Sequence, residues 1–451
     1  MRTERAGCRG TPSAPGRTGP RNEYTAGMSV TLAPEDLVYL RMSAQGLTAT
    51  AQDLAAAEQS SDDAGDMSAG RTAPEGASTG PTGPNDTNAE PTGTSAERIA
   101  ETARRMLAIQ SQDWRAARWA LGVRTPGSTV NDVHDAFARG LIVRSWPMRG
   151  TIHVVAAEDI GWMQQVTNQR VLAGAPKRRE FLGLDDATLD RLVEVSLEAL
   201  RGQSLSRDEL STIWTEAGIG WRSNWRYHVV WWLCQNGLAV FGPVSDGGEP
   251  RLVRVDEWIE HPRKVVGDDA LAEFATRYVS ARGAVSAKDL AWWSGLTMRE
   301  AKLALSLARE AGNVIAIGTE VDGRTEMWAD PRQLHAITAS PQLYKSEWLL
   351  LPAFDEHLLG YQDRSAQLDP EHFERIVPGR NGMFLATVVY GGRVVGTWKR
   401  GTKTSIGVVA TPLPGQKLST ENRDLQARTR EWLAFHGRPG ADFALATSEN
   451  A

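Results

Sequence analysis

The sequence predicts an α+β fold, and two observations carry this prediction. One local pattern, made of capped helices followed by two strands around a tight turn, occurs three times between residues 97 and 340. Beyond residue 340, strand-like segments are more frequent and one helix closes the chain. With 451 residues, 41% of them hydrophobic and 23% charged, the chain is long enough for two to four domains.

The segment before the first repeat is predicted to contain little folded structure. We expect a disordered N-terminal extension over residues 1–34 and a first helix of the folded region over residues 35–49. Residues 50–96 are mainly Ala, Gly, Ser, Thr, Pro and acidic residues without apolar periodicity. Such a segment cannot bury enough surface to offset its ordering entropy, so it is predicted to be a disordered acidic insert.

The first repeat covers residues 97–200. Thr129 to Asp132 fits a helix cap, and the helix that follows runs to Arg139. Leu141 to Met148 and Thr151 to Val155 are predicted strands, joined by the turn Arg149-Gly150.

The second repeat covers residues 201–265 and has the same order. Ser206 to Glu209 is a capping box, and Trp225 to Gln235 is a predicted helix. Leu238 to Val244 and Arg251 to Val255 are predicted strands around Asp246-Gly247-Gly248.

The third repeat covers residues 266–340 and contains two caps, Ser286 to Asp289 and Thr297 to Glu300. Two strands, Val314 to Val321 and Arg324 to Trp328, are predicted around Asp322-Gly323. The later helix of this repeat has one apolar face, formed by Ala301, Ala304, Leu305 and Ala308.

Two helices followed by a two-stranded wing is the order of a winged helix, so the repeats predict three winged helices in tandem. Winged helices usually bind duplex DNA through a helix in the major groove and a wing on the backbone. The alternative is that the repeats are helical hairpins with β-ribbons in an ordinary α+β protein.

A small, barrel-like β domain is predicted over residues 341–440, followed by a tail over 441–451. Gly391-Gly392 is a tight hairpin turn within it, and Ser419 to Phe435 is the terminal helix. The predicted strands are Trp348 to Leu351, Phe384 to Tyr390, Arg393 to Trp398 and Ser405 to Ala410.

Charge and cysteine content limit the classes of function. The net charge is −5, but residues 50–97 alone carry nine acidic residues and one arginine, so the remainder is at +3. No run approaches the roughly 18 apolar residues of a membrane span, and Cys8 and Cys234 do not form a disulfide framework or a thiolate metal site. We expect a cytoplasmic protein, nucleoid-associated when on DNA, without a membrane partner.

A helix predicted over Ile99 to Ile109 runs into Gln110-Ser111-Gln112-Asp113. If the chain is extended there, both glutamine side chains point the same way. Spacing alone predicts no function, because such amides commonly cap or bridge helix ends.

Several linked motifs resemble the AlkZ-like DNA glycosylases, over about Leu37 to Gly437 apart from the acidic insert. The matching segments are Gln110 to Asp113, Arg115 to Arg118, Met148 to Asp159, Leu351 to Arg364, Asn381-Gly382 and Gly392 to Trp398. The resemblance implies three winged helices with a C-terminal β domain, and hydrolysis of the N-glycosidic bond of alkylated purines in double-stranded DNA, including unhooking of interstrand crosslinks. It also implies that Gln110 and Gln112 are the catalytic pair; Ser111 stands between them where an aliphatic residue is usual.

This assignment is chemically coherent. An N3- or N7-alkylated purine is cationic and leaves as a neutral base, so a carboxamide that orients water and faces the developing sugar cation suffices. We therefore expect little activity on unmodified DNA. No lysine adjoins the pair, so strand cleavage through a Schiff base is not expected, and no cofactor is predicted. Asp113 is a rival general base, or the cap of the helix that begins at Trp114.

Arg149 and His153 on the first wing, and Arg364, are predicted to contact DNA, with ordinary solvated or structurally paired side chains as the alternative. Asp355, Glu356 and His357 have side chains of ligand types, but consecutive strand residues alternate faces, so no metal site is predicted. We expect a monomer. The competing functional hypotheses are a winged-helix DNA-binding protein or transcriptional regulator without catalysis, and a relative that has lost both roles.

Overall fold

A computed structural model describes residues 31–48, 93–319, 326–339, 347–401, 407–438 and 444–445. These residues form a mixed α+β fold, as predicted. Most of the predicted extension, insert and tail lies outside the described residues, as do the turn Asp322-Gly323 and Ser405. Within the described ranges, no helix combines the length and apolarity that a membrane span requires.

The first repeat contains the predicted capped helix and hairpin. Thr129 accepts a hydrogen bond from the backbone N–H of Asp132, which confirms the predicted cap. The helix predicted over Ile99 to Ile109 is wrong at its C-terminal end: it stops at Met106, because Leu107 has φ of 61° and turns the chain into a strand. The elements are α3 (Ser95–Met106), β2 (Ile109–Gln110), α4 (Trp114–Gly122), α5 (Val130–Ala138), β3 (Ile142–Met148) and β4 (Thr151–Ala156).

A helical segment without strands connects the first hairpin to the second repeat, and the predicted capping box of Ser206 with Glu209 is present. This part comprises η2 (Ala157–Asp159), α6 (Ile160–Thr167), α7 (Gln169–Ala173), α8 (Ala175–Leu182), α9 (Asp186–Ala199), α10 (Arg207–Glu216), α11 (Ser223–Gln235), β5 (Ala239–Val244), β6 (Pro250–Arg254) and α12 (Val255–Trp258).

The third repeat has both predicted caps, at Ser286 and Thr297. Its strands form a small sheet with the strand β1 from the N-terminal side of the insert, in the order β1-β8-β9-β7. The elements are β1 (Thr31–Leu32), α1 (Pro34–Ala44), α13 (Gly267–Arg282), β7 (Val285–Ser286), α14 (Ala287–Ser294), α15 (Met298–Glu310), β8 (Ile315–Thr319), β9 (Met327–Ala329) and α16 (Pro331–Ala339).

The C-terminal part is an open sheet, so the barrel-like prediction is wrong. Among the described residues the strand order is β10-β11-β12-β13-β14, and its two end strands do not pair with each other. The elements are β10 (Trp348–Leu351), α17 (Glu356–Leu359), η3 (Pro370–His372), α18 (Phe373–Ile376), η4 (Pro378–Arg380), β11 (Thr387–Tyr390), β12 (Arg393–Arg400), β13 (Val408–Pro412), α19 (Arg423–Phe435) and β14 (Ala444–Leu445).

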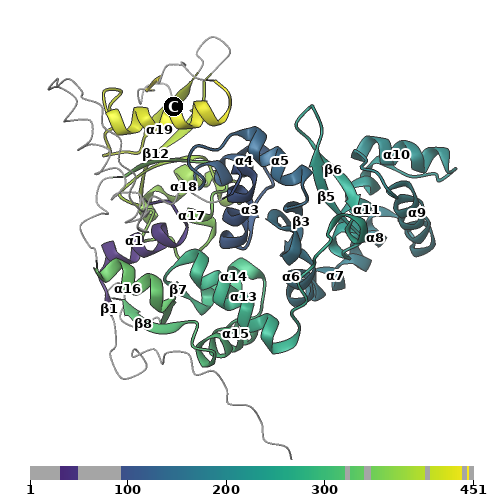
Figure 1. The fold of residues 1–451 in the computed structure, drawn as a ribbon, viewed down its shortest axis with the longest axis horizontal. Helices are drawn as coiled ribbons and strands as arrows, with labels where there is room; N and C mark the ends of the chain where they lie inside the picture. Colours follow the sequence, from purple (N-terminus) through teal and green to yellow (C-terminus); the bar gives the residue numbers. More distant parts are fainter. Residues whose placement is uncertain are drawn as a thin grey trace, which may run out of the picture.

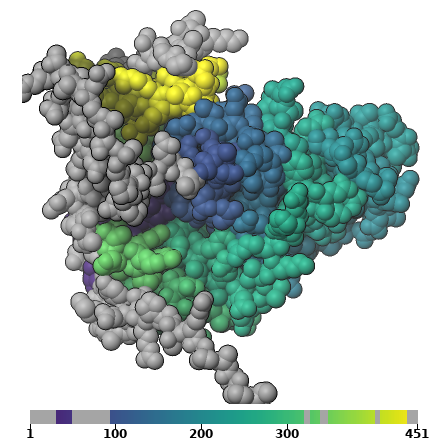
Figure 2. All heavy atoms as spheres, in the orientation of Figure 1, coloured from purple at the N-terminus to yellow at the C-terminus, as the bar shows by residue number. Residues whose placement is uncertain are grey.

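The hairpins of the first two repeats share one sheet, which the sequence did not predict. Its order is β2-β4-β3-β5-β6, and Arg144 pairs with Phe241 where β3 meets β5. Figure 1 shows α3 to α5 in the centre, with the second repeat on one side. In the space-filling view of Figure 2, the first repeat lies between the C-terminal part above and the third repeat below.

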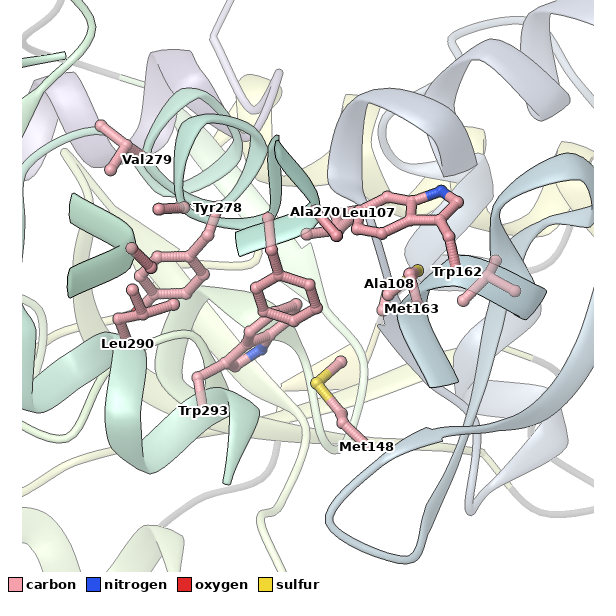
Figure 3. Packing of buried hydrophobic residues seen from close by; sticks show 14 of the residues in the cluster. Leu107, Ala108, Met148, Trp162, Met163, Ala270, Tyr278, Val279, Leu290 and Trp293 are labelled. Atoms are coloured by element: carbon pink, nitrogen blue, oxygen red, sulfur yellow. The ribbon is translucent and has the colours of Figure 1, made fainter. Parts of the chain in front are cut away.

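One apolar cluster joins the first repeat to the third. Leu107 and Ala108, which follow α3, belong to the same cluster as Tyr278 of α13 and Trp293 of α14, and all are buried (Figure 3). The short segment between α3 and the glutamine motif is therefore packed against another repeat, which restricts its position.

Candidate active site

The two glutamines lie side by side at the end of β2. The Nε2 of Gln110 donates a hydrogen bond to the Oε1 of Gln112 at 3.3 Å. Gln110 is 8% exposed, whereas Gln112 is exposed. The amide of Gln110 is therefore buried, and it is hydrogen-bonded to the exposed amide of Gln112.

Ser111 occupies the opposite side of this extended segment. It is fully buried, its N–H donates to the carbonyl of Ile152 at 2.9 Å, and its hydroxyl accepts from the Nε of Arg144 at 3.1 Å. A second guanidinium nitrogen of Arg144 donates to the Ser111 carbonyl at 2.7 Å. The hydroxyl of Ser111, at a position where an aliphatic side chain is usual, therefore has a buried hydrogen-bond partner in Arg144.

Asp113 caps α4, as one of the two sequence hypotheses held. Its Oδ1 accepts from the backbone N–H groups of Arg115 at 2.9 Å and Ala116 at 3.1 Å. A carboxylate in these two bonds fixes the start of α4, and hence the direction in which the chain leaves Gln112.

A polar cavity of about 440 Å³ begins at Gln112. Its other wall is the β5–β6 turn, which Trp114 holds by donating from Nε1 to the carbonyl of Gly248 at 2.7 Å. The lining residues are Gln112, Asp113, Trp114, Arg115, Arg118, Gly247, Gly248 and Glu249. The exposed amide of the pair therefore faces a space bounded by the first and second repeats.

Arg149 and Arg364, predicted independently, meet on one tryptophan. The guanidinium of Arg149 lies 5.0 Å from the ring centroid of Trp292, and that of Arg364 lies 4.7 Å from the same ring. Burial lowers the pKa of Arg149, and it lowers the pKa of Arg364 to about 10. Both side chains are partly exposed. Two cationic side chains, one from the first hairpin and one from the C-terminal part, therefore lie against the same tryptophan ring.

His153 lies inside the protein rather than on the surface of the wing. It pairs with Gln110 in the β2–β4 register and is 0% exposed. Its Nδ1 lies 2.8 Å from the carbonyl oxygen of Thr151, which can only accept, so this nitrogen carries the proton. Burial lowers the pKa of His153 to about 3. A neutral, enclosed imidazole does not present a cation to phosphate in this conformation.

Asp355, Glu356 and His357 begin the short helix α17, so the strand geometry assumed for them is wrong. Each contacts a different part of the protein. Asp355 binds Arg124, Glu356 accepts the backbone N–H of Gln110 at 3.1 Å, and the Nε2 of His357 lies 2.9 Å from the Gly392 carbonyl. In the part of the chain that the structure describes, no His, Cys, Asp and Glu side chains gather as a metal site would require.

Sequence reasoning missed three residues next to the pair. Arg144 fixes Ser111, and Arg282 and Trp293 hold the carboxylate of Glu356. For Glu356 a metal site was considered from the sequence and none was predicted, and no role beside the glutamine pair was assigned. Nothing in the sequence pointed to these contacts, because Arg144 is 33 residues from Ser111, and Arg282 and Trp293 are 74 and 63 residues from Glu356.

Comparisons with known proteins agree on one group. The family model described as "DNA glycosylase AlkZ-like" matches residues 103–435. The chain is similar to the "Interstrand DNA cross-link repair glycosylase" of Streptomyces sahachiroi, with 24% identity over 341 residues, which is 72% of this chain and 87% of the relative. The solved structure of the Streptomyces sahachiroi DNA glycosylase AlkZ has a similar fold, with a TM-score of 0.65 and 19% identity, covering 93% of this chain and 100% of that one.

Proposed function

Because the chain belongs to the AlkZ-like DNA glycosylase family, and is thus an enzyme that hydrolyses N-glycosyl bonds in DNA, we propose that its substrates are alkylated purines in duplex DNA. Gln110 and Gln112 are the proposed catalytic residues. The observation that carries the proposal is their geometry: two amides in contact, one buried and one exposed at the mouth of a polar cavity.

The direction of the hydrogen bond between the amides supports a role in positioning water. Gln110 donates through Nε2, so its own amide oxygen can accept from a water molecule, and the oxygen of Gln112 retains a second lone pair. Neither amide is a base near neutral pH. The pair therefore suits a bond that breaks readily, as it does when the leaving purine is already cationic.

DNA contacts are proposed for Arg149 and Arg364, which extend the site on the side of Trp292. We retain the interpretation of the three repeats as tandem winged helices, and a monomeric protein on double-stranded DNA. For His153 we now propose a structural role beneath Gln110 in place of a DNA contact, because the side chain is enclosed.

Unhooking of interstrand crosslinks is proposed as part of the same activity. A crosslink through purine nitrogens has the same cationic leaving group on each strand as a simple alkylated purine. The relative from Streptomyces sahachiroi is named for cross-link repair, and the open cavity beside Gln112 leaves room for an adduct larger than a methyl group.

The experiment that tests this proposal is base release from a plasmid treated with a methylating agent. The wild-type protein is expected to create abasic sites that break only after hot alkali, as a monofunctional enzyme does. The double variant Gln110→Ala/Gln112→Ala should create none above background, whereas Gln203→Ala, on an exposed glutamine far along the chain, should match wild type. Equal release by the double variant and wild type would show that other residues carry the chemistry.

A further inference from the structure

We propose that Glu356, from the C-terminal part of the chain, is a positioning residue for the glutamine pair, and that the pair is correctly placed only while Glu356 holds β2. This inference rests on the proposed function of Gln110 and Gln112. It extends that function to a residue that lies outside the glutamine motif and that does not touch the substrate.

The carboxylate of Glu356 bridges β2 to the third repeat. Its Oε1 accepts the backbone N–H of Gln110 at 3.1 Å. Its Oε2 accepts from the Nη2 of Arg282 at 2.7 Å and from the Nε1 of Trp293 at 2.9 Å. Glu356 is 1% exposed and Arg282 is fully buried. Charge-assisted hydrogen bonds in such surroundings are short, directional and hard to replace with water.

Arg282 also holds the chain that leads into β2. Its two terminal nitrogens donate to the carbonyl of Met106 at 3.2 Å and to that of Ala108 at 3.1 Å. These two carbonyls flank Leu107, a buried leucine with φ of 61°. A non-glycine residue adopts this conformation only when its surroundings impose it. The ion pair thus fixes the turn before Gln110 and the N–H of Gln110 itself.

The position of β2 explains why a side chain is needed there. β2 has two residues, and among the strands of the described residues it lies at the edge of its sheet and pairs with β4 alone. The outward N–H of an edge strand has no ladder partner, and a buried N–H requires one. Glu356 supplies the acceptor that a further strand would have supplied, and it thereby fixes the backbone of Gln110 at the edge of the sheet.

The neighbouring residue Asp355 provides a matched control. It forms a bidentate ion pair with Arg124, both bonds at 2.8 Å, and is also buried. This pair joins the N-terminus of α17 to Arg124, which follows α4, and it includes no residue of β2. Asp355 also caps α17 by accepting from the N–H of His357, a role that asparagine retains.

The test compares Glu356→Gln with Asp355→Asn in the full-length protein. A glutamine at 356 can offer its oxygen to Gln110 or to Arg282, but its NH₂ group then faces a donor on the other side. Single-turnover release of 7-methylguanine from duplex DNA should fall by about 10- to 100-fold in Glu356→Gln with unchanged DNA affinity. Both variants lose a buried ion pair, so their melting temperatures should fall by similar amounts. Asp355→Asn should nevertheless release the base at a rate close to that of the wild type.

A second readout does not depend on activity. Amide hydrogen exchange of Gln110 should accelerate in Glu356→Gln and remain slow in Asp355→Asn. The positioning role is overturned if the amide of Gln110 exchanges slowly in both variants, or if both variants lose the same factor in the rate of base release. If instead the double glutamine variant keeps full activity, the proposed function fails, while the exchange of Gln110 still decides whether Glu356 holds β2.

Discussion

Gln110 and Gln112 differ in what surrounds them, and this difference predicts different consequences of mutation. Gln110 is 8% exposed and belongs to β2, whereas Gln112 is exposed at the cavity. Gln112→Ala should reduce base release strongly while leaving the melting temperature unchanged. Gln110→Ala should reduce both, because its truncation leaves space in a packed region. Single-turnover kinetics and thermal unfolding of the two variants check this, and a destabilised Gln112→Ala would contradict it.

Ser111 separates packing from chemistry within the same motif. Its hydroxyl contacts the buried Arg144 and points away from the amides. Ser111→Ala removes one hydrogen bond but leaves Arg144 bound to the Ser111 carbonyl, so the free energy of unfolding should fall by about 1 kcal/mol. Urea unfolding measures this change. Base release should stay near wild type; a large loss of rate with unchanged stability would indicate that Ser111 takes part in the reaction.

At the scale of elements, the hairpin turn between β3 and β4 and the loop that follows α17 bring Arg149 and Arg364 onto Trp292. If both arginines contact phosphate, each alanine substitution should weaken DNA binding uniformly across sequences and lower the salt dependence of binding by roughly one counterion. Binding titrations at several salt concentrations measure both effects. Arg191→Ala, on an exposed residue of α9, is the control and should change neither. Unchanged salt dependence in the Arg149 and Arg364 variants would assign these side chains to protein packing alone.

The elements predicted best from sequence are those fixed by local chemistry. The caps at Thr129, Ser206, Ser286 and Thr297 are confirmed, because a cap depends on residues three apart. The end of α3 was predicted wrongly. Its apolar periodicity continues to Ile109, but β2 forms by pairing with β4, over forty residues away, and that pairing leaves no local signal.

The candidate site shows the same division between local and long-range information. The glutamine pair, Arg149 and Arg364 could be proposed from the sequence because they lie in contiguous motifs. Glu356 was singled out for its side-chain type, but its contacts with Gln110 and Arg282 were not predicted, because these partners are 246 and 74 residues away. The open C-terminal sheet was also mispredicted, because strand patterns indicate which segments pair but not whether the first and last strands meet.

For the whole molecule, two enclosed histidines predict how stability depends on pH. Burial lowers the pKa of His153 to about 3 and that of His357 to about 4, and both side chains are 0% exposed. In the unfolded chain each takes up a proton near pH 6.5, so the unfolded state binds more protons as pH falls below that value. Their contribution to stability is complete above about pH 6.5 and is lost progressively as the pH falls to about 4 for His357 and to about 3 for His153.

Urea unfolding at several pH values checks this prediction. The free energy of unfolding should fall between pH 7 and pH 5, with a limiting slope of about 1.4 kcal/mol per pH unit for each histidine. His357→Gln keeps a donor for the Gly392 carbonyl. In this variant the dependence of the free energy of unfolding on pH should lose the contribution of one histidine. A variant of the exposed His261 should keep the wild-type slope. Stability that is constant from pH 7 to pH 5 would contradict the assignment.

The first and third repeats and the C-terminal part of the folded protein meet at β2, and the proposed catalytic pair consists of the last residue of this strand, Gln110, and the nearby Gln112. The most direct measurement is single-turnover release of 7-methylguanine from a duplex with one such base, at saturating protein. We predict that Gln110→Ala/Gln112→Ala binds this duplex with wild-type affinity and releases the base at the uncatalysed rate. Release by the double variant at the wild-type rate would contradict the claim.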